Sequence, residues 1–288
     1  MTPLSLEAPA KLNLSLRVVG QRPDGFHLLE TQMVLLELAD RLLLMPGAPG
    51  LRVEAAPGEE IPLDGTNLAW RGLAAALGTQ PAQVCLALEK RIPASAGLGG
   101  GSSDAAAAWR LGRRALAAPD AATAEDLASL ADLGADVPFF AARVAAAHVT
   151  GIGEVVTPLD APSPDHAVLA FPSFRLSTAA VFGELRPADL TAERPDRNDL
   201  LAAVLRLRPE LGDLMRQVSD AGGDPCLTGS GSTIFALTDD PERAAAIATE
   251  LRRAGVRVTE TRLRGEPAQI LELDEATLDA GAPAPSMG

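Results

Sequence analysis

Aromatic residues, cysteines and histidines are scarce in this sequence of 288 residues, and tyrosine is absent. Only two cysteines occur, Cys85 and Cys226, and each lies in an apolar stretch. We therefore expect two reduced, buried thiols and a cytoplasmic protein, because disulfides belong mainly to oxidising compartments. The three histidines are scattered along the chain, so their spacing does not suggest a zinc site.

Basic residues are also fewer than acidic ones. Lys and Arg number 25 against 38 Asp and Glu, which gives a net charge of −13. This balance argues against a broad nucleic-acid-binding surface, and an anionic substrate would need a local pocket of cations or backbone amides. The sequence has no run of 18 apolar residues and no charged start followed by an apolar segment. We expect neither a membrane span nor a signal peptide.

The most informative stretch is a glycine-rich loop, PASAGLGGGSS, at residues 93–103. Apolar residues alternate over residues 84–89, which predicts a strand before the loop, and the alanines at 105–108 predict a helix after it. Ser102 and Ser103 are good N-cap residues for that helix. The glycines permit positive φ and close approach to a ligand, so the loop and the helix N-terminus predict a phosphate site. The alternative is an ordinary strand–helix connection, which so many glycines would only weaken.

This loop differs from the two common phosphate-binding patterns. A P-loop has a lysine after its last glycine, where this chain has Ser102. The dinucleotide fingerprint directly follows a strand, whereas here Pro93 and three further residues precede Gly97. The loop therefore predicts phosphate binding of another class.

Two charged residues outside the loop are candidates for chemistry. Residues 4–19 read as a strand broken at Pro9, in which Lys11 and Asn13 lie on the polar face. A lone lysine in such a place is usually a solvated surface residue. Asp136 stands in GADVP at the predicted start of a short helix, so its simplest role is to cap that helix. The pattern alone leaves catalysis and these structural roles open.

A turn-rich loop at residues 20–27, GQRPDGFH, ends in an aromatic pair, Phe26 and His27. This pair either anchors the loop on the core or contacts a ligand. Farther along the chain, Thr66 or Asn67 is predicted to cap the next helix.

Prolines cluster at residues 158–164, where we place a domain boundary that divides the chain into residues 1–158 and 159–288. The second part contains a small-residue loop, LTGSGST at residues 227–233, that leads into an apolar strand. The last residues, 279–288, are expected to form a disordered tail.

Five motifs together resemble those of the GHMP kinases, the superfamily of galactokinase, homoserine kinase and mevalonate kinase. They are APAKLNL at 8–14, GQRPDGFH, the glycine-rich loop, GADVP at 134–138 and LTGSGST. The resemblance implies an α+β fold with an N-terminal ATP-binding domain at 1–158, a C-terminal domain at 159–288 and the active site in the cleft between them. GQRPDGFH and the long GLGGGSSD are most similar to the branch that phosphorylates a cytidyl diphosphate sugar alcohol in non-mevalonate isoprenoid biosynthesis.

The resemblance implies transfer of the γ-phosphoryl group of ATP, with Mg²⁺, to the 2-hydroxyl of this small-molecule substrate, with no nucleic acid or membrane as partner. Lys11 and Asp136 would be catalytic: Lys11 would neutralise charge, and Asp136 would accept the proton or hold the hydroxyl in place. Ser103 would contact Mg²⁺. ATP would be bound by Asn67, Pro93, Ala94, Ser95, Ala96, Gly97, Leu98, Gly99, Gly100, Gly101, Ser102 and Ser103. The substrate would be bound by Asn13, Phe26, His27, Phe182, Thr228 and Gly229. In this arrangement the cytosine stacks between Phe26 and Phe182, and His27 bonds to its edge.

The sequence departs from the usual pattern of this branch at Phe26, where tyrosine is frequent, and at residues 94–96 before the glycines. Neither departure touches the transferring groups. A sister enzyme such as homoserine or mevalonate kinase would share the ATP loop but has no use for an aromatic cytosine site. A protein of this fold that binds ligand without turning it over is the other alternative, and the intact Lys11 and Asp136 argue against it.

Overall fold

The computed structural model describes residues 1–79, 81–160, 166–190 and 197–274. The expected linker lies partly outside these residues, and the expected disordered tail at 279–288 lies wholly outside them.

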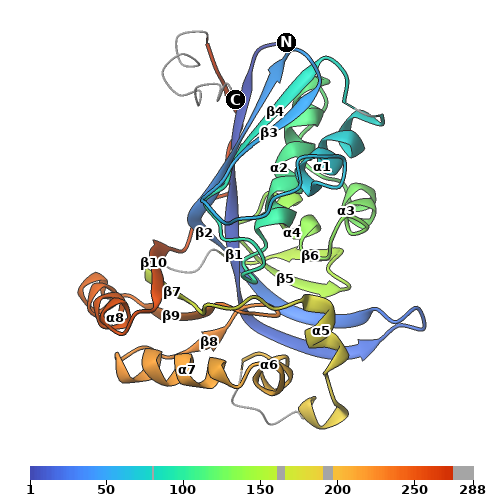
Figure 1. Cartoon of the computed structure of the whole chain (residues 1–288). Coiled ribbons are helices and arrows are strands. Elements are labelled where there is room, and N and C mark those ends of the chain that lie inside the picture. Colours follow the sequence, from blue (N-terminus) through green and yellow to red (C-terminus); the bar gives the residue numbers. More distant parts are fainter. Residues whose placement is uncertain (80, 161–165, 191–196, 275–288) are drawn as a thin grey trace.

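Two long strands, β1 (Leu4–Gln21) and β2 (His27–Pro46), form the antiparallel hairpin on which the molecule is built (Figure 1). The turn between them confirms the predicted hairpin loop. They are central to a seven-stranded sheet in the order β11-β1-β2-β4-β3, from which β5 and β6 branch off at β2. The other strands of this sheet are β3 (Gly50–Glu54), β4 (Val84–Glu89), β5 (Ala146–Gly151), β6 (Val155–Pro158) and β11 (Leu271–Glu272).

Helices cover one face of this sheet (Figure 1). They are α1 (Leu68–Leu77), α2 (Gly100–Ala115), α3 (Ala124–Leu130) and α4 (Val137–Ala141). Asn67 caps α1 as predicted, because its side chain accepts a hydrogen bond from the backbone N–H of Ala69. The apolar residues of α1 and α2 pack with those of β1, β2 and β4, such as Leu73 and Leu111 against Leu86. This packing fixes α2, and with it the loop that precedes α2.

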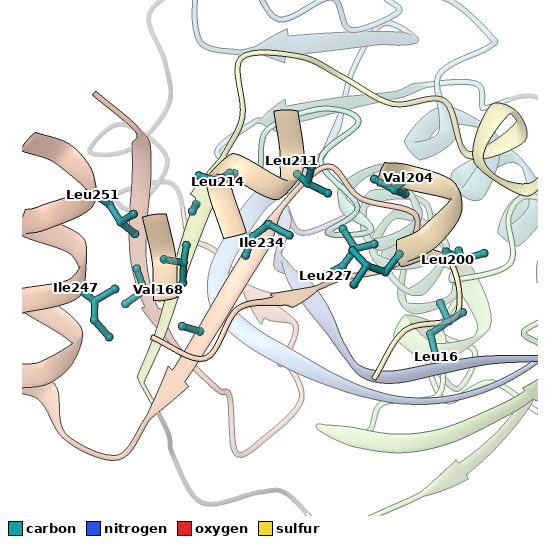
Figure 2. Packing of buried hydrophobic residues seen from close by; sticks show 14 of the residues in the cluster. Leu16, Val168, Leu200, Val204, Leu211, Leu214, Leu227, Ile234, Ile247 and Leu251 are labelled. Carbon is teal, nitrogen blue, oxygen red and sulfur yellow. The ribbon is translucent and has the colours of Figure 1, made fainter. Parts of the chain in front are cut away.

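A second sheet of four strands has the order β10-β7-β9-β8. Its strands are β7 (His166–Phe171), β8 (Cys226–Leu227), β9 (Ile234–Thr238) and β10 (Arg257–Arg262). The helices that follow or cover it are α5 (Thr178–Gly183), a 3-10 turn (Pro187–Asp189), α6 (Leu201–Leu207), α7 (Glu210–Asp220) and α8 (Pro241–Arg253). Figure 2 shows Val168 and Ile234 of this sheet beside Leu214 of α7 and Leu251 of α8, in one apolar cluster.

The two sheets are joined by a shared core. Leu169 of β7 and Phe235 of β9 point away from the helices and pack with Leu12 and Leu36 of the first sheet. Strands β7 and β9 therefore bury both faces, which explains why they read as short continuous apolar runs.

The chain passes from the first sheet to the second between β6, which ends at Pro158, and β7, which begins at His166, and our boundary between residues 158 and 159 stays a prediction. Two segments nevertheless cross this boundary. The far end of β1 contributes Leu16 and Val18 to the core of the second part. β11 pairs with the start of β1, and Ala268 packs in the core of the first part.

Two details of the sequence interpretation are wrong. β1 is not broken at Pro9, because a register shift between Pro9 and Lys11 accommodates the missing proline N–H within a continuous strand. Helix α2 begins earlier than predicted, with Gly99 in the left-handed conformation (φ 71°) as its N-cap. Ser102 and Ser103 therefore lie in the first turn of the helix rather than at its cap.

The close crossing of α1 and α2 leads to a stability prediction. A Cβ added at Gly72 would lie 2.1 Å from the carbonyl oxygen of Ala105. Gly72→Ala should therefore lower the free energy of unfolding by about 1–3 kcal/mol, as overpacking does. Gly212→Ala is the matched control, since its Cβ would meet nothing closer than 3.7 Å in α7. The control should raise stability by up to about 1 kcal/mol through helix propensity. If urea titrations show that both substitutions change the free energy of unfolding in the same direction, the packing argument is contradicted.

Candidate active site

A cavity of about 750 Å³ lies between the two parts of the chain. The glycine-rich loop forms one wall with every residue from Pro93 to Ser102, and Asn67 lies beside it. Lys11, Asn13 and Asp136 form the floor, while Phe182 and Gly229 come from the second part. Most residues that the sequence suggested are therefore brought to one cavity. Ser103, Thr228, Phe26 and His27 are the predicted residues that do not lie on its wall.

The glycine-rich loop is held by hydrogen bonds from both parts of the chain. The backbone N–H of Lys11 donates to the Leu98 carbonyl at 3.0 Å, and the Thr233 hydroxyl donates to the Ala96 carbonyl at 2.6 Å. Gly97 and Gly99 both have positive φ, at 77° and 71°. At Gly97 the available space also requires a glycine, since a Cβ would lie 2.7 Å from carbonyl oxygens of the second part. The loop thus leads α2 into the cavity N-terminus first, which is an anion-binding geometry.

Lys11 is buried rather than exposed on a polar face, which corrects the sequence interpretation. Its residue exposure is 2%, because the loop after β8 covers this part of β1. Its Nζ donates to Asn13 Oδ1 at 2.5 Å and lies 3.4 Å from Asp136 Oδ2. A buried ammonium is costly unless it is paired and hydrogen-bonded, so both partners are needed where they stand.

Asp136 occupies the N-cap position of α4, as predicted, but its side chain makes no capping hydrogen bond. Its carboxylate faces Lys11 in the cavity instead, and its side chain is 28% exposed. Capping therefore does not account for an aspartate at this position, whereas a role beside Lys11 does.

The loop after β8 closes the site from the second part. The backbone N–H of Asn13 donates to the Thr228 hydroxyl at 3.1 Å, and a Cβ at Gly229 would lie 3.1 Å from Lys11 Nζ. Sequence reasoning missed the residue that holds this loop in place, Asn198. Its side-chain amide donates to the carbonyl oxygens of Leu227 and Gly229, at 3.0 and 2.8 Å. No local pattern in the sequence distinguished Asn198 from its neighbours.

The predicted aromatic pair is arranged differently from our expectation. His27 stacks on Phe182, with ring centroids 4.9 Å apart and an interplanar angle of 28°. Phe26 is 59% exposed. A base that stacked on the face of Phe182 that His27 covers would therefore have to displace the His27 ring.

A charged cluster beside the glycine-rich loop was also missed. Lys90 bonds to two buried carboxylates, Asp40 and Asp104, the latter at 2.7 Å. Burial lowers the pKa of Lys90, but the charges of Asp104 and Asp40 outweigh burial and raise it. Burial also raises the pKa of Asp104, against the opposing charge of Lys90. Asp104 is buried by the packing of α2 against the first sheet, which its place near the start of a predicted helix does not indicate.

Asn67 and Ser103 have surroundings that differ from those expected for ligand-binding residues. The Asn67 side chain caps α1 and donates to the Pro62 carbonyl at 2.7 Å, so it shapes the cavity edge as well as lining it. Ser103 Oγ is buried without a hydrogen-bond partner, but it lies on a much smaller cavity beside Arg110. The structure does not place this hydroxyl where we expected Mg²⁺. Ser102, one residue earlier, lies on the wall of the large cavity.

The fold and this site can be compared with known proteins. The pattern described as "GHMP kinases N terminal domain" matches residues 67–143, and "GHMP kinases C terminal" matches residues 186–257. A 4-diphosphocytidyl-2-C-methyl-D-erythritol kinase of Dinoroseobacter shibae is 40% identical over 274 residues, which cover 86% of this chain and 90% of that protein. The chain belongs to this family of GHMP kinases. The family's enzyme from Thermus thermophilus is 39% identical, with 86% of this chain and 92% of that protein covered.

Solved structures agree with the family. A crystal structure of 4-(cytidine 5'-diphospho)-2C-methyl-D-erythritol kinase is 38% identical with a TM-score of 0.73, over 91% of this chain and 99% of that one. A mevalonate kinase shares the fold, with a TM-score of 0.61 at 14% identity, over 91% of this chain and 99% of that one. The chain is thus an ATP-dependent small-molecule kinase. None of the helices in the described residues is long and apolar enough to cross a membrane.

The geometry of the loop predicts that Gly99 is needed for nucleotide binding. Gly99→Ala places a Cβ about 3.0 Å from the Phe140 ring and 3.1 Å from Lys11 Cγ, at a residue with positive φ. We expect ATP affinity in calorimetry to fall about 10-fold or more, equivalent to about 1.4 kcal/mol. Gly255→Ala is the control for backbone strain, since Gly255 has φ 81° and open space around it. Unchanged ATP affinity in folded Gly99→Ala would show that the loop does not hold phosphate.

Proposed function

We propose that this protein transfers the γ-phosphoryl group of ATP to the 2-hydroxyl of 4-diphosphocytidyl-2-C-methyl-D-erythritol, a step of non-mevalonate isoprenoid biosynthesis. The observation that carries the proposal is the Lys11–Asp136 pair, 3.4 Å apart on the floor of a cavity that the N-terminus of α2 also enters. Such a pair supplies a cation for the transferring group and an acceptor for the hydroxyl proton. The relatives from Dinoroseobacter shibae and Thermus thermophilus and the solved structure at 38% identity are all named as kinases of this substrate.

Phosphoryl transfer passes through a loose transition state, so positioning and charge carry most of the catalysis. The amides of Gly99 to Ser102 would hold the phosphates at the helix N-terminus. Lys11 would stabilise the charge on the transferring group, while Asn13 keeps its ammonium oriented. Asp136 would align the hydroxyl and take its proton. These groups are held before substrate arrives, so little reorganisation accompanies reaction.

Mg²⁺ is a further part of the proposal. Among the described residues, no group of three or more His, Cys, Asp or Glu side chains could hold a metal by itself. An ion bound mainly through ATP phosphates would suit this site. The Ser102 hydroxyl and the Asp136 carboxylate are side-chain oxygens on the cavity wall that would contact it. When bound, Mg²⁺ neutralises phosphate charge in such reactions.

The cytidine end of the substrate would lie toward Phe182, with Phe26 closing over the base as His27 moves to its edge. We also propose a cytoplasmic location, supported by the two cysteines, Cys85 and Cys226, which are both free.

An ADP-release assay tests the substrate directly. The wild type should turn over 4-diphosphocytidyl-2-C-methyl-D-erythritol and leave homoserine and mevalonate nearly untouched. Equal or faster turnover of either alternative would overturn the substrate assignment while leaving the kinase assignment in place.

Asp136→Asn should lower kcat about 10²-fold or more and leave both KM values nearly unchanged, because an amide cannot accept the proton. Lys11→Met should show a similar loss. The control is Asp132→Asn, which changes an exposed aspartate nearby. If Asp136→Asn keeps a kcat near the wild-type value, Asp136 has a structural role and not a catalytic one.

Phe26→Ala should raise the KM for the cytidyl substrate roughly 5- to 150-fold, since stacking on a base contributes about 1–3 kcal/mol. The KM for ATP should hardly change. Phe26→Tyr retains the ring and should behave like the wild type. A variant that raised only the ATP KM would show that this aromatic loop contacts adenine instead of cytosine.

A further inference from the structure

The turn between β5 and β6, at residues 151–154, packs against the backbone that carries Asp136. The contact is made by Gly153, which has φ 118°. A Cβ added there would lie 1.9 Å from the carbonyl oxygen of Ala135 and 2.8 Å from its carbonyl carbon. These are backbone atoms of the residue next to Asp136, so no side-chain rotation can relieve the clash.

Asp136 depends on such backbone contacts for its position. Its side chain makes no capping bond, and its carboxylate lies 3.4 Å from the buried Nζ of Lys11. The bend before α4 is closed by one hydrogen bond, from Val137 N–H to the Gly134 carbonyl at 3.0 Å. The turn at Gly153 is the neighbour that limits how far Ala135 can move.

This turn is itself fixed to the sheet that carries Lys11. The Glu154 carboxylate accepts a hydrogen bond from the Ile152 N–H at 2.6 Å and so closes the turn. β5 pairs with β2 along its whole length, and β2 pairs with β1, where Lys11 lies opposite Leu35. A continuous path of backbone hydrogen bonds therefore runs from Lys11 to Gly153, and the contact with Ala135 completes it.

We propose that Gly153 is a positioning residue for phosphoryl transfer: its contact with Ala135 sets the place of Asp136 relative to Lys11. The proposal rests on the proposed role of Asp136. A glycine is required because only the missing side chain lets the turn approach Ala135 closely enough.

Gly153→Ala tests the proposal. Real Cβ atoms stay at least 3.0 Å from such neighbours, so the turn and Ala135 must move apart by about 1 Å. A misplacement of this size can cost about 10²-fold in rate, and we expect kcat to fall about 10- to 100-fold. Both KM values should stay within about threefold, because neither ATP nor the cytidyl group contacts this turn in the proposed complex. Gly255→Ala controls for the strain of alanine at positive φ and should keep the wild-type kcat.

A double-mutant cycle separates positioning from general damage. In the Asp136→Asn background, Gly153→Ala should lower kcat less than twofold further, since the group that it displaces is already disabled. An equal fold-loss in both backgrounds would overturn the proposal, as would a Gly153→Ala enzyme with wild-type kcat.

Glu154→Ala provides a second variant if Gly153→Ala does not fold. It removes the acceptor that closes the turn without adding any atom, and kcat should fall about 3- to 10-fold at unchanged KM. A wild-type kcat in this variant would overturn the proposal. A wild type that does not phosphorylate the cytidyl substrate would instead count against the proposed function, so the two failures are distinct.

Discussion

A buried positive charge imposes the main constraint on this structure. The ammonium of Lys11 has almost no access to solvent, and burial of an unpaired ion costs several kcal/mol. The fold meets this cost with oxygen atoms from two directions, Asn13 Oδ1 along the same strand and Asp136 Oδ2 from the start of α4. The backbone of Lys11 also supports the glycine-rich loop through Leu98. The charge, its partners and the glycine-rich loop are therefore one unit.

The second part of the chain completes this unit rather than merely covering it. Thr233 and Thr228 contact the glycine-rich loop and Asn13, and Asn198 fixes the loop that carries Thr228. Glu59 adds a contact at the mouth of the cavity, where its carboxylate binds both Arg175 at 2.9 Å and the Ala94 N–H at 3.2 Å. Residues 1–158 alone would lack the contacts from Thr228, Thr233 and Arg175, and the glycine-rich loop would be held only by contacts within the first part.

Local patterns predicted the elements that local interactions determine. The hairpin turn at Gly25, the cap at Asn67 and the strand before the glycine-rich loop all follow from the residues themselves. Burial by distant segments could not be predicted in this way. Lys11 alternates like a surface residue, but segments distant in sequence bury it, among them Gly99 of the glycine-rich loop and Gly229 of the loop after β8.

The same limit applies to the charged cluster and to the aromatic residues. Asp104 has the sequence signature of a first-turn acid, yet tertiary packing pairs it with Lys90. His27 and Phe182 are far apart in sequence, so their stacking depends on how β1 and β2 reach α5. Most of the residues that the resemblance to GHMP kinases named lie on the cavity wall, because a motif records spatial neighbours that a single sequence does not otherwise show.

The length of β1 has a mechanical consequence. This one strand carries Leu6 in the core of the first part, Leu12 in the core between the sheets and Leu16 in the core of the second part. It is paired with β2 along nearly all of its residues. Because one paired ribbon runs through all three cores, a hinge between the two parts would have to bend this ribbon at its register shifts. We therefore expect substrates to enter and products to leave mainly through movements of side chains and short loops at the rim of the cavity.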